Sequence, residues 1–168
     1  MGRYGKTRMN DDEYPVVLEG IERSVQKNFH ECGARCTFMV LKYYGKVRSY
    51  NKVYDDLHRT DGGITPASMK RLIREKGLTA GEFDGRGIDK LKKSIDMGAP
   101  IIAWIYRELN IKVERISINH WVVVYGYDRG NIWVMDPNPL AIRKRIPIKS
   151  FKKKWSGGGI VVRRKKGK

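Results

Sequence analysis

The sequence has few cysteines, no long apolar run and no glycine-rich phosphate-binding motif. Its 168 residues contain two cysteines, too few for a disulfide framework. No stretch approaches the about 18 consecutive apolar residues that a membrane-spanning helix needs, and no apolar stretch follows the basic N-terminus. We therefore expect neither a transmembrane helix nor a Sec-type signal. The glycine cluster Gly157-Gly158-Gly159 precedes an expected strand rather than a helix, so it does not have the context of a phosphate-binding loop.

The two cysteines are expected to be free thiols. Cys32 and Cys36 are four positions apart on one expected helix, where β-carbons lie about 5–6 Å apart. A disulfide requires about 3.8 Å between them. Free thiols are typical of a reducing compartment. We therefore expect a cytoplasmic protein, with virion association or export without a Sec signal as the alternatives.

Acidic residues are also scarce, above all at the C-terminal end. The chain has 35 Lys and Arg against 18 Asp and Glu, which gives a formal net charge of +17. Residues 137–168 contain twelve Lys or Arg and no Asp or Glu. Such a field concentrates polyanions, and the candidates are acidic cell-wall polymer, nucleic acid, anionic lipid and an acidic peptide. The alternative is a solvated basic face without a specific partner.

The length and the 40% hydrophobic content predict one domain with one core. We expect residues 1–14 to form an N-terminal arm that is disordered or orders on contact. Residues 15–162 are expected to form the folded domain, and residues 163–168 a basic C-terminal tail.

Apolar spacing predicts helices in the first half of the chain and strands in the second. The central helix runs from Gly33 with three-and-four spacing and ends at Gly45. Tyr106 to Asn119 is expected to be an irregular loop, and a turn over 128–131 is expected to join two strands. This order predicts an α+β fold in which a helical layer packs on an antiparallel sheet. Further helices are expected at 51–58, 65–77 and 88–97, and strands at 101–105, 121–127, 132–135, 141–146 and 160–162.

Three residues have the chemistry of a nucleophile, its base and an orienting acid: Cys32, His120 and Asp136. Cys32 comes just before an expected helix, whose N-terminus lowers the pKa of a thiol. Asp136 follows His120 by a strand, a tight turn and a return strand. Asp128 is the competing carboxylate, but it lies in the expected turn.

Other residues complete or compete with this site. Gln26 can supply the side-chain amide of an oxyanion hole, and Gly33 would let a substrate carbonyl approach the backbone. Cys36 falls on the core face of the helix and is expected to be structural. A zinc site built from His30, Cys32 and Cys36 lacks the usual ligand spacing and a fourth ligand, so no metal and no cofactor is expected.

The order Gln26, Cys32-Gly33, His120 and Asp136-Pro137 resembles the papain-like clan of cysteine peptidases. Within that clan it is similar to the bacteriocin-processing family, the double-glycine leader peptidases, here without an ABC exporter. The six-residue spacing from Gln26 to Cys32 belongs to this pattern. The similarity extends from about Gln26 to about Val162, with Met39, Tyr43-Tyr44-Gly45 and the block 120–128 in register. Arg35 stands where the family usually has a small residue.

The resemblance implies a papain-like fold with a central helix that bears the cysteine. It implies catalysis by Cys32, His120 and Asp136, an oxyanion hole at Gln26, and substrate contacts at residues such as Trp121. The expected reaction is hydrolysis of a peptide bond, after Gly-Gly in a leader peptide. One alternative is a phage- or virus-type lysin, an endopeptidase that cleaves cell-wall cross-links with the same site. The other is a catalytically silent papain-like module that binds nucleic acid through its basic C-terminal segment.

Overall fold

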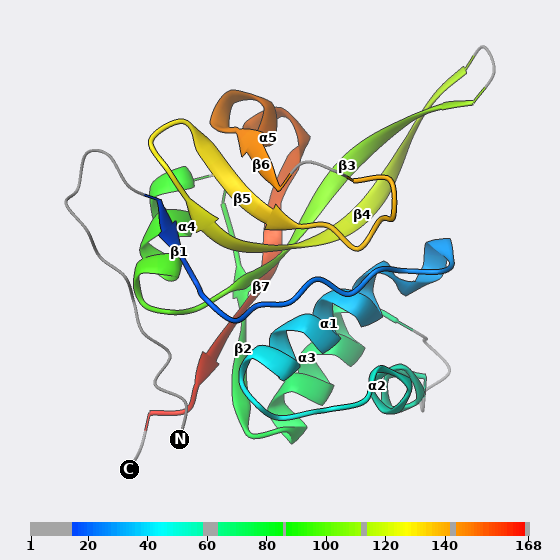
Figure 1. The fold of residues 1–168 in the computed structure, drawn as a ribbon, viewed down its shortest axis with the longest axis vertical. Helices are drawn as coiled ribbons and strands as arrows, with labels where there is room; N and C mark the ends of the chain where they lie inside the picture. The colour runs from blue at the N-terminus through cyan, green and yellow to red at the C-terminus, as the bar shows by residue number, and fades with distance from the viewer. Residues whose placement is uncertain (1–14, 59–63, 86, 112–113, 142–143, 167–168) are drawn as a thin grey trace.

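A computed structural model describes residues 15–58, 64–85, 87–111, 114–141 and 144–166 (Figure 1). The expected N-terminal arm, residues 1–14, lies outside these ranges. The strands form one antiparallel sheet in the order β2-β7-β3-β4-β5-β6, and β1 pairs with β4. Their bounds are β1 (Val16–Val17), β2 (Leu78–Phe83), β3 (Ile101–Ile111), β4 (Glu114–Tyr127), β5 (Asn131–Met135), β6 (Arg145–Pro147) and β7 (Trp155–Arg164).

The three helices of the first half of the chain gather on one side of the sheet, with α1 central among them (Figure 1). This arrangement confirms the expected α+β class, a helical layer on an antiparallel sheet. The helical elements are η1 (Phe29–Glu31), α1 (Cys32–Tyr43), α2 (Tyr50–Leu57), α3 (Pro66–Glu75), α4 (Ile88–Asp96) and α5 (Ile148–Lys154).

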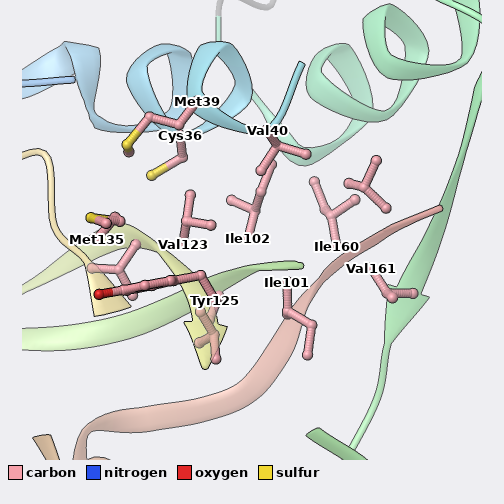
Figure 2. Packing of buried hydrophobic residues seen from close by; sticks show 14 of the residues in the cluster. Cys36, Met39, Val40, Ile101, Ile102, Val123, Tyr125, Met135, Ile160 and Val161 are labelled. Carbon is pink, nitrogen blue, oxygen red and sulfur yellow. The ribbon is translucent and has the colours of Figure 1, made fainter. Parts of the chain in front are cut away.

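The core between α1 and the sheet is a row of aliphatic side chains on neighbouring strands. Ile102 of β3 pairs with Val123 of β4 and with Ile160 of β7, so the three side chains lie on one face of the sheet. All are at most 1% exposed. These side chains are removed from water where they pack against α1, and this burial is the main contribution to the stability of the layer. In Figure 2, the side chains on the core face of α1 point toward these strands; they are Cys36, Met39 and Val40.

The C-terminal end of α1 is tied to strand β7 of the sheet. The helix stops at Gly45, whose φ of +70° is a left-handed conformation that glycine adopts without strain. The Tyr44 hydroxyl next to this end donates to the carbonyl oxygen of Val162 at 2.9 Å. The helix therefore has a fixed position along the sheet, which in turn fixes its first residue, Cys32.

Three sequence expectations about elements are wrong. Tyr106 to Asn119 is not a loop, because β3 and β4 form one long hairpin in unbroken register from Ile101↔Val124 to Ile111↔Glu114. The expectation overlooked strand β2 and helix α5 altogether. The basic tail does not begin at residue 163, since β7 continues to Arg164 and pairs there with Leu78. The strands among these segments were missed because they contain polar residues. A strand at a sheet edge or in a hairpin needs only one apolar face, so its sequence has no continuous apolar run.

Candidate active site

Cys32 is the first residue of α1 and is half-buried. The short helix η1 leads the chain directly into it. Burial alone raises the pKa of the Cys32 thiol, but a hydrogen bond with the His120 ring and one with the backbone N–H of Trp121 outweigh it. The positive imidazole and the Gly33 N–H act in the same direction, so the thiol pKa lies below its ordinary value. The Cys32 thiol therefore loses its proton more readily than an ordinary cysteine does.

His120 and Asp136 meet across two adjacent strands. His120 lies in β4 opposite Ile105 of β3, and its side chain is 4% exposed. The tight turn after β4 returns the chain along β5, and Asp136 is the residue that follows this strand. The His120 Nε2 atom lies 2.6 Å from the Asp136 Oδ1 atom. Since Nε2 faces the carboxylate, Nδ1 is the ring nitrogen that can face Cys32.

The imidazole of His120 is held as a cation between two negative groups. Burial alone lowers the pKa of His120, but the hydrogen bonds and charges of Asp136 and Cys32 raise it to about 9. A raised imidazole pKa and a lowered thiol pKa favour the same state, a thiolate–imidazolium pair. Such a pair is the reactive form of a cysteine nucleophile.

Gln26 lies in the segment before η1, close to the residues that follow Asp136. Its backbone N–H donates to the carbonyl oxygen of Pro137 at 2.8 Å. Its side chain is largely buried, and the Oε1 atom has no hydrogen-bond partner within the described part of the chain. The structure therefore brings all four residues expected to form the site into one region, although they come from four separate segments.

The loop that carries Asp136 is fixed by two residues that the sequence analysis did not identify. The Asn138 N–H donates to Asp136 Oδ1 at 2.8 Å, the same oxygen that faces His120. The Arg23 side chain donates to the carbonyl oxygens of Asp136, at 2.7 Å, and of Asn138. Neither residue has a sequence signal of its own, because Arg23 contacts backbone groups distant in the sequence and Asn138 acts through its backbone N–H.

The loop that carries Gln26 is fixed by an ion pair between Glu31 and Arg35, on either side of Cys32. Glu31 Oε2 accepts from the Lys27 N–H at 3.1 Å and from Arg35 Nε at 3.0 Å. Arg35 also donates to Ser24 Oγ at 3.2 Å and stacks on the Tyr50 ring, 3.3 Å from its centroid. The arginine that departs from the family pattern therefore anchors both sides of Gln26.

The two residues expected to contact substrate lie beside the thiol. Gly33 is buried, and a Cβ there would approach Ile64 Cγ2 to 2.8 Å and Met69 Sδ to 3.2 Å. The lack of a side chain is thus explained by packing rather than by the close approach of a substrate carbonyl that we expected. Trp121 is half-buried and stacks on Trp104 with a centroid separation of 5.4 Å. These groups crowd the surface next to Cys32.

The competing residues lie elsewhere. Asp128 Oδ1 accepts the N–H groups of Gly130 and Asn131 in the β4–β5 turn, so its carboxylate holds the turn and does not face His120. Cys36 is fully buried, and burial raises the pKa of its thiol well above the ordinary value. Within the described ranges, no three His, Cys, Asp or Glu side chains gather as a metal site would require.

The same described ranges contain no helix with the length and apolarity needed to span a membrane.

Known proteins share both the sequence pattern and the fold. Residues 21–167 match the Peptidase C39 family. The lactococcin-G-processing and transport ATP-binding protein LagD of Lactococcus lactis is 31% identical over 133 residues, which is 79% of this chain and 17% of that protein. The chain therefore spans about a sixth of the length of this curated relative.

Solved structures with low sequence identity have the same fold. A C39-like peptidase from Bacillus anthracis is 18% identical, with a TM-score of 0.70 over 93% of this chain and all of that one. The double glycine motif protease of an AMS/PCAT transporter, solved with its leader peptide, is 24% identical, with a TM-score of 0.65 over 91% of this chain and all of that one. The peptidase domain of Streptococcus ComA is 20% identical, with a TM-score of 0.66 over 86% and 99% of the two chains. Because the family match covers nearly the whole chain, the protein belongs to the Peptidase C39 family of cysteine peptidases.

Proposed function

We propose that this protein hydrolyses a peptide bond through Cys32, His120 and Asp136, with Gln26 in the oxyanion hole. The observation that carries the proposal is the 2.6 Å contact between His120 Nε2 and Asp136 Oδ1, with the Cys32 thiol near enough to the same ring to help raise its pKa. This arrangement fixes the orientation of the imidazole and stabilises its cation. The lowered pKa of the Cys32 thiol also argues against a silent binding module, which has no need of a reactive thiol.

In the proposed reaction the Cys32 thiolate attacks the carbonyl carbon of the substrate. The negative oxygen that develops is stabilised by the Gln26 side-chain amide and by the backbone N–H of Cys32. His120 donates its proton to the leaving amine, the C–N bond breaks, and the acyl group remains as a thioester on Cys32. A water molecule then loses a proton to His120, attacks the thioester and releases the free acid and the thiolate.

We further propose that the substrate has Gly-Gly immediately before the cleaved bond, in a leader peptide. Two observations support this. Ile64 and Trp121 lie close around Gly33, the residue after Cys32, and we infer that they leave little room for a side chain next to the scissile carbonyl. LagD is described as lactococcin-G-processing, and another relative of known structure is described as a double glycine motif protease.

Cleavage of matched peptides tests this function. Peptides that differ only in having Gly-Gly, Gly-Ala or Val-Val at one site are incubated with the protein, and products are identified by mass spectrometry. We expect cleavage after Gly-Gly, absent in Cys32→Ala, and a loss of about tenfold or more in kcat/KM for each added side chain. Preference for a peptide taken from a cell-wall cross-link would instead support the lysin alternative. Cleavage that persists in Cys32→Ala would refute the proposal.

A further inference from the structure

A pocket of about 210 Å³ lies beside Gln26, and the proposed reaction makes no use of it. Its walls come from two segments, the residues leading to η1 and the residues following Asp136. The backbone bond from the Gln26 N–H to the Pro137 carbonyl oxygen joins these segments at 2.8 Å. Arg107 of β3 closes the remaining side. The pocket therefore adjoins the proposed site through Gln26, although Cys32, His120 and Asp136 do not line it.

The rim of this pocket is apolar and exposed. Phe29 is 71% exposed and Leu140 is 79% exposed, which makes them the most exposed large hydrophobic side chains of the described residues. Each comes from a different wall of the same pocket. Two such side chains on opposite rims offer an apolar ligand group more buried surface than either would alone.

The other residues that line the pocket include two basic side chains and two buried polar atoms that lack hydrogen-bond partners among the described residues. Lys27 and Arg107 line the pocket, and no acidic residue is among the described residues that line it. Glu31, which is hydrogen-bonded to Lys27 and Asn28, is paired with Arg35. Gln26 Oε1 and Asn138 Nδ2 are buried without a hydrogen-bond partner in the described structure. One is an acceptor and the other a donor, and both residues are more than nine-tenths buried. A bound peptide group supplies the complementary N–H and C=O, which removes the cost of unpaired buried polar atoms.

The position of the pocket indicates which half of a substrate it would meet. The leaving amine must face the imidazole, because His120 protonates it. Asn138 in the pocket donates to the same Asp136 oxygen that faces His120. Ile64 and Trp121 lie instead around Gly33, the residue after Cys32, and do not line the pocket. The pocket thus adjoins both the proposed oxyanion amide and the loop that orients His120, whose proton the leaving amine takes.

We infer that this pocket is a specificity subsite for the residues that follow the cleaved bond, selecting an apolar side chain with an acidic side chain next to it. The inference rests on the proposed cleavage at Cys32. The apolar group lies between Phe29 and Leu140, and the acidic group pairs with Lys27 and Arg107. The subsite acts only before the leaving peptide departs. It therefore affects formation of the thioester and not its hydrolysis.

The test uses peptides with one acyl half, ending in Gly-Gly, and three leaving halves that begin Leu-Asp, Leu-Lys or Ser-Asn. Rapid-quench kinetics separate thioester formation from hydrolysis. For the unaltered protein we expect faster thioester formation with Leu-Asp than with the other two, by about tenfold against Ser-Asn. Hydrolysis of the thioester is expected to proceed at one rate for all three, since the acyl half is shared.

Substitutions identify the pocket as the origin of this preference. Leu140→Ser should remove the advantage of Leu-Asp over Ser-Asn, and Arg107→Glu should shift the preference from Leu-Asp to Leu-Lys. Met97→Ser, which alters an exposed apolar residue just after α4, and Lys152→Glu, which alters an exposed lysine on α5, are the matched controls and should behave like the unaltered protein.

Every other outcome overturns either the subsite or the proposed function. Equal rates for the three leaving halves, or a preference that survives both pocket substitutions, would overturn the subsite while leaving the proposed cleavage intact. A change in thioester hydrolysis would place the pocket on the acyl half. Failure to form any thioester with the three peptides would refute the proposed function itself, and the subsite with it.

Discussion

At the scale of single residues, the two thiols lie one helical turn apart in opposite environments. Cys32 is half-buried beside the His120 imidazole, whereas Cys36 is enclosed in the core between α1 and the sheet. Because the thiolate is the nucleophile, we expect iodoacetamide at neutral pH to label Cys32 and to leave Cys36 unlabelled. Peptide mapping by mass spectrometry measures this. Labelling of Cys36 ahead of Cys32 would show that the reactive thiol is assigned to the wrong residue.

Asp136 controls the pH at which the imidazole loses its proton. It helps to raise the pKa of His120 to about 9, so the protonated ring persists to that pH and activity is expected to fall above it. Asp136→Asn removes the negative charge, which lowers the imidazole pKa and shifts the alkaline limb of kcat/KM to lower pH. The control is Asp128→Asn, in the turn, which should leave the limb in place. The opposite ranking of the two variants would identify Asp128 as the orienting acid.

Arg35 is expected to act on the rate through Gln26. Removing a donor from an oxyanion hole lowers kcat by about 10²–10³, and we expect this of Gln26→Ala. Arg35→Ala releases Ser24 and Glu31, so it should give a smaller loss of the same kind, with iodoacetamide labelling of Cys32 unchanged. In the double variant the two losses should not add, because they affect one interaction. Additive losses, or slower labelling of Cys32, would show that Arg35 acts elsewhere.

At the scale of helices and strands, the sequence reveals elements that have a strong period or a capping signal. Thr65-Pro66 predicted a helix start, and α3 begins there with the Thr65 side chain accepting the Ser68 N–H at 3.1 Å. The α1 period was equally clear, because its core face is continuous. Strand β2 was missed because Gly81 and Glu82 interrupt its apolar alternation, and the outer part of the β3–β4 hairpin because charged residues interrupt its own.

The positions of the site residues on the helices and strands also explain how much of the site could be predicted from the sequence. Cys32, His120 and Asp136 were predicted because their residue types and order match the papain-like pattern, and each stands at the end of an apolar segment. Arg23 was not predicted because its contacts join residues far apart in the sequence, and Asn138 and the Glu31–Arg35 pair because short-range polar contacts of this kind have no distinctive pattern. Residue type carries no information about such contacts until the topology is known.

The Thr65 cap is a measurable part of helix stability. Thr65→Ala removes the acceptor for the Ser68 N–H and is expected to lower the free energy of unfolding by about 1 kcal/mol. Thr65→Ser keeps the hydroxyl and should remain close to the unaltered protein. Urea unfolding of the three proteins measures the difference. Equal loss in both variants would mean that the Thr65 methyl group, and not the hydrogen bond, supports the helix.

At the scale of the whole molecule, the excess positive charge can be separated from catalysis. Arg163 and Arg164 belong to β7, so the segment that can be removed without cutting the sheet is 165–168. We expect its removal to weaken polyanion binding and to flatten the salt dependence by up to about 0.9 log units per lost lysine contact. Turnover of a neutral Gly-Gly peptide should be unchanged. Removal of 163–168 should also lower the melting temperature, because it deletes two residues paired with β2.

A binding titration at several salt concentrations measures this, with heparin or oligonucleotide as the polyanion probe. An unchanged salt slope after removal of 165–168 would mean that the end of the chain is a solvated basic face. Loss of peptide turnover in the same variant would connect the end of the chain to the site, against the separation argued above.

The central claim is that Cys32 forms a thioester with the acyl half of a peptide substrate while His120 protonates the other half. Trapping that thioester is its most direct test. A Gly-Gly peptide ester is mixed with the protein, quenched in acid within the first turnover and digested for mass spectrometry. We predict the acyl mass on the peptide that contains Cys32, absent in Cys32→Ala and strongly reduced in His120→Ala. Acyl mass on another residue, or an unchanged adduct in Cys32→Ala, would contradict the account.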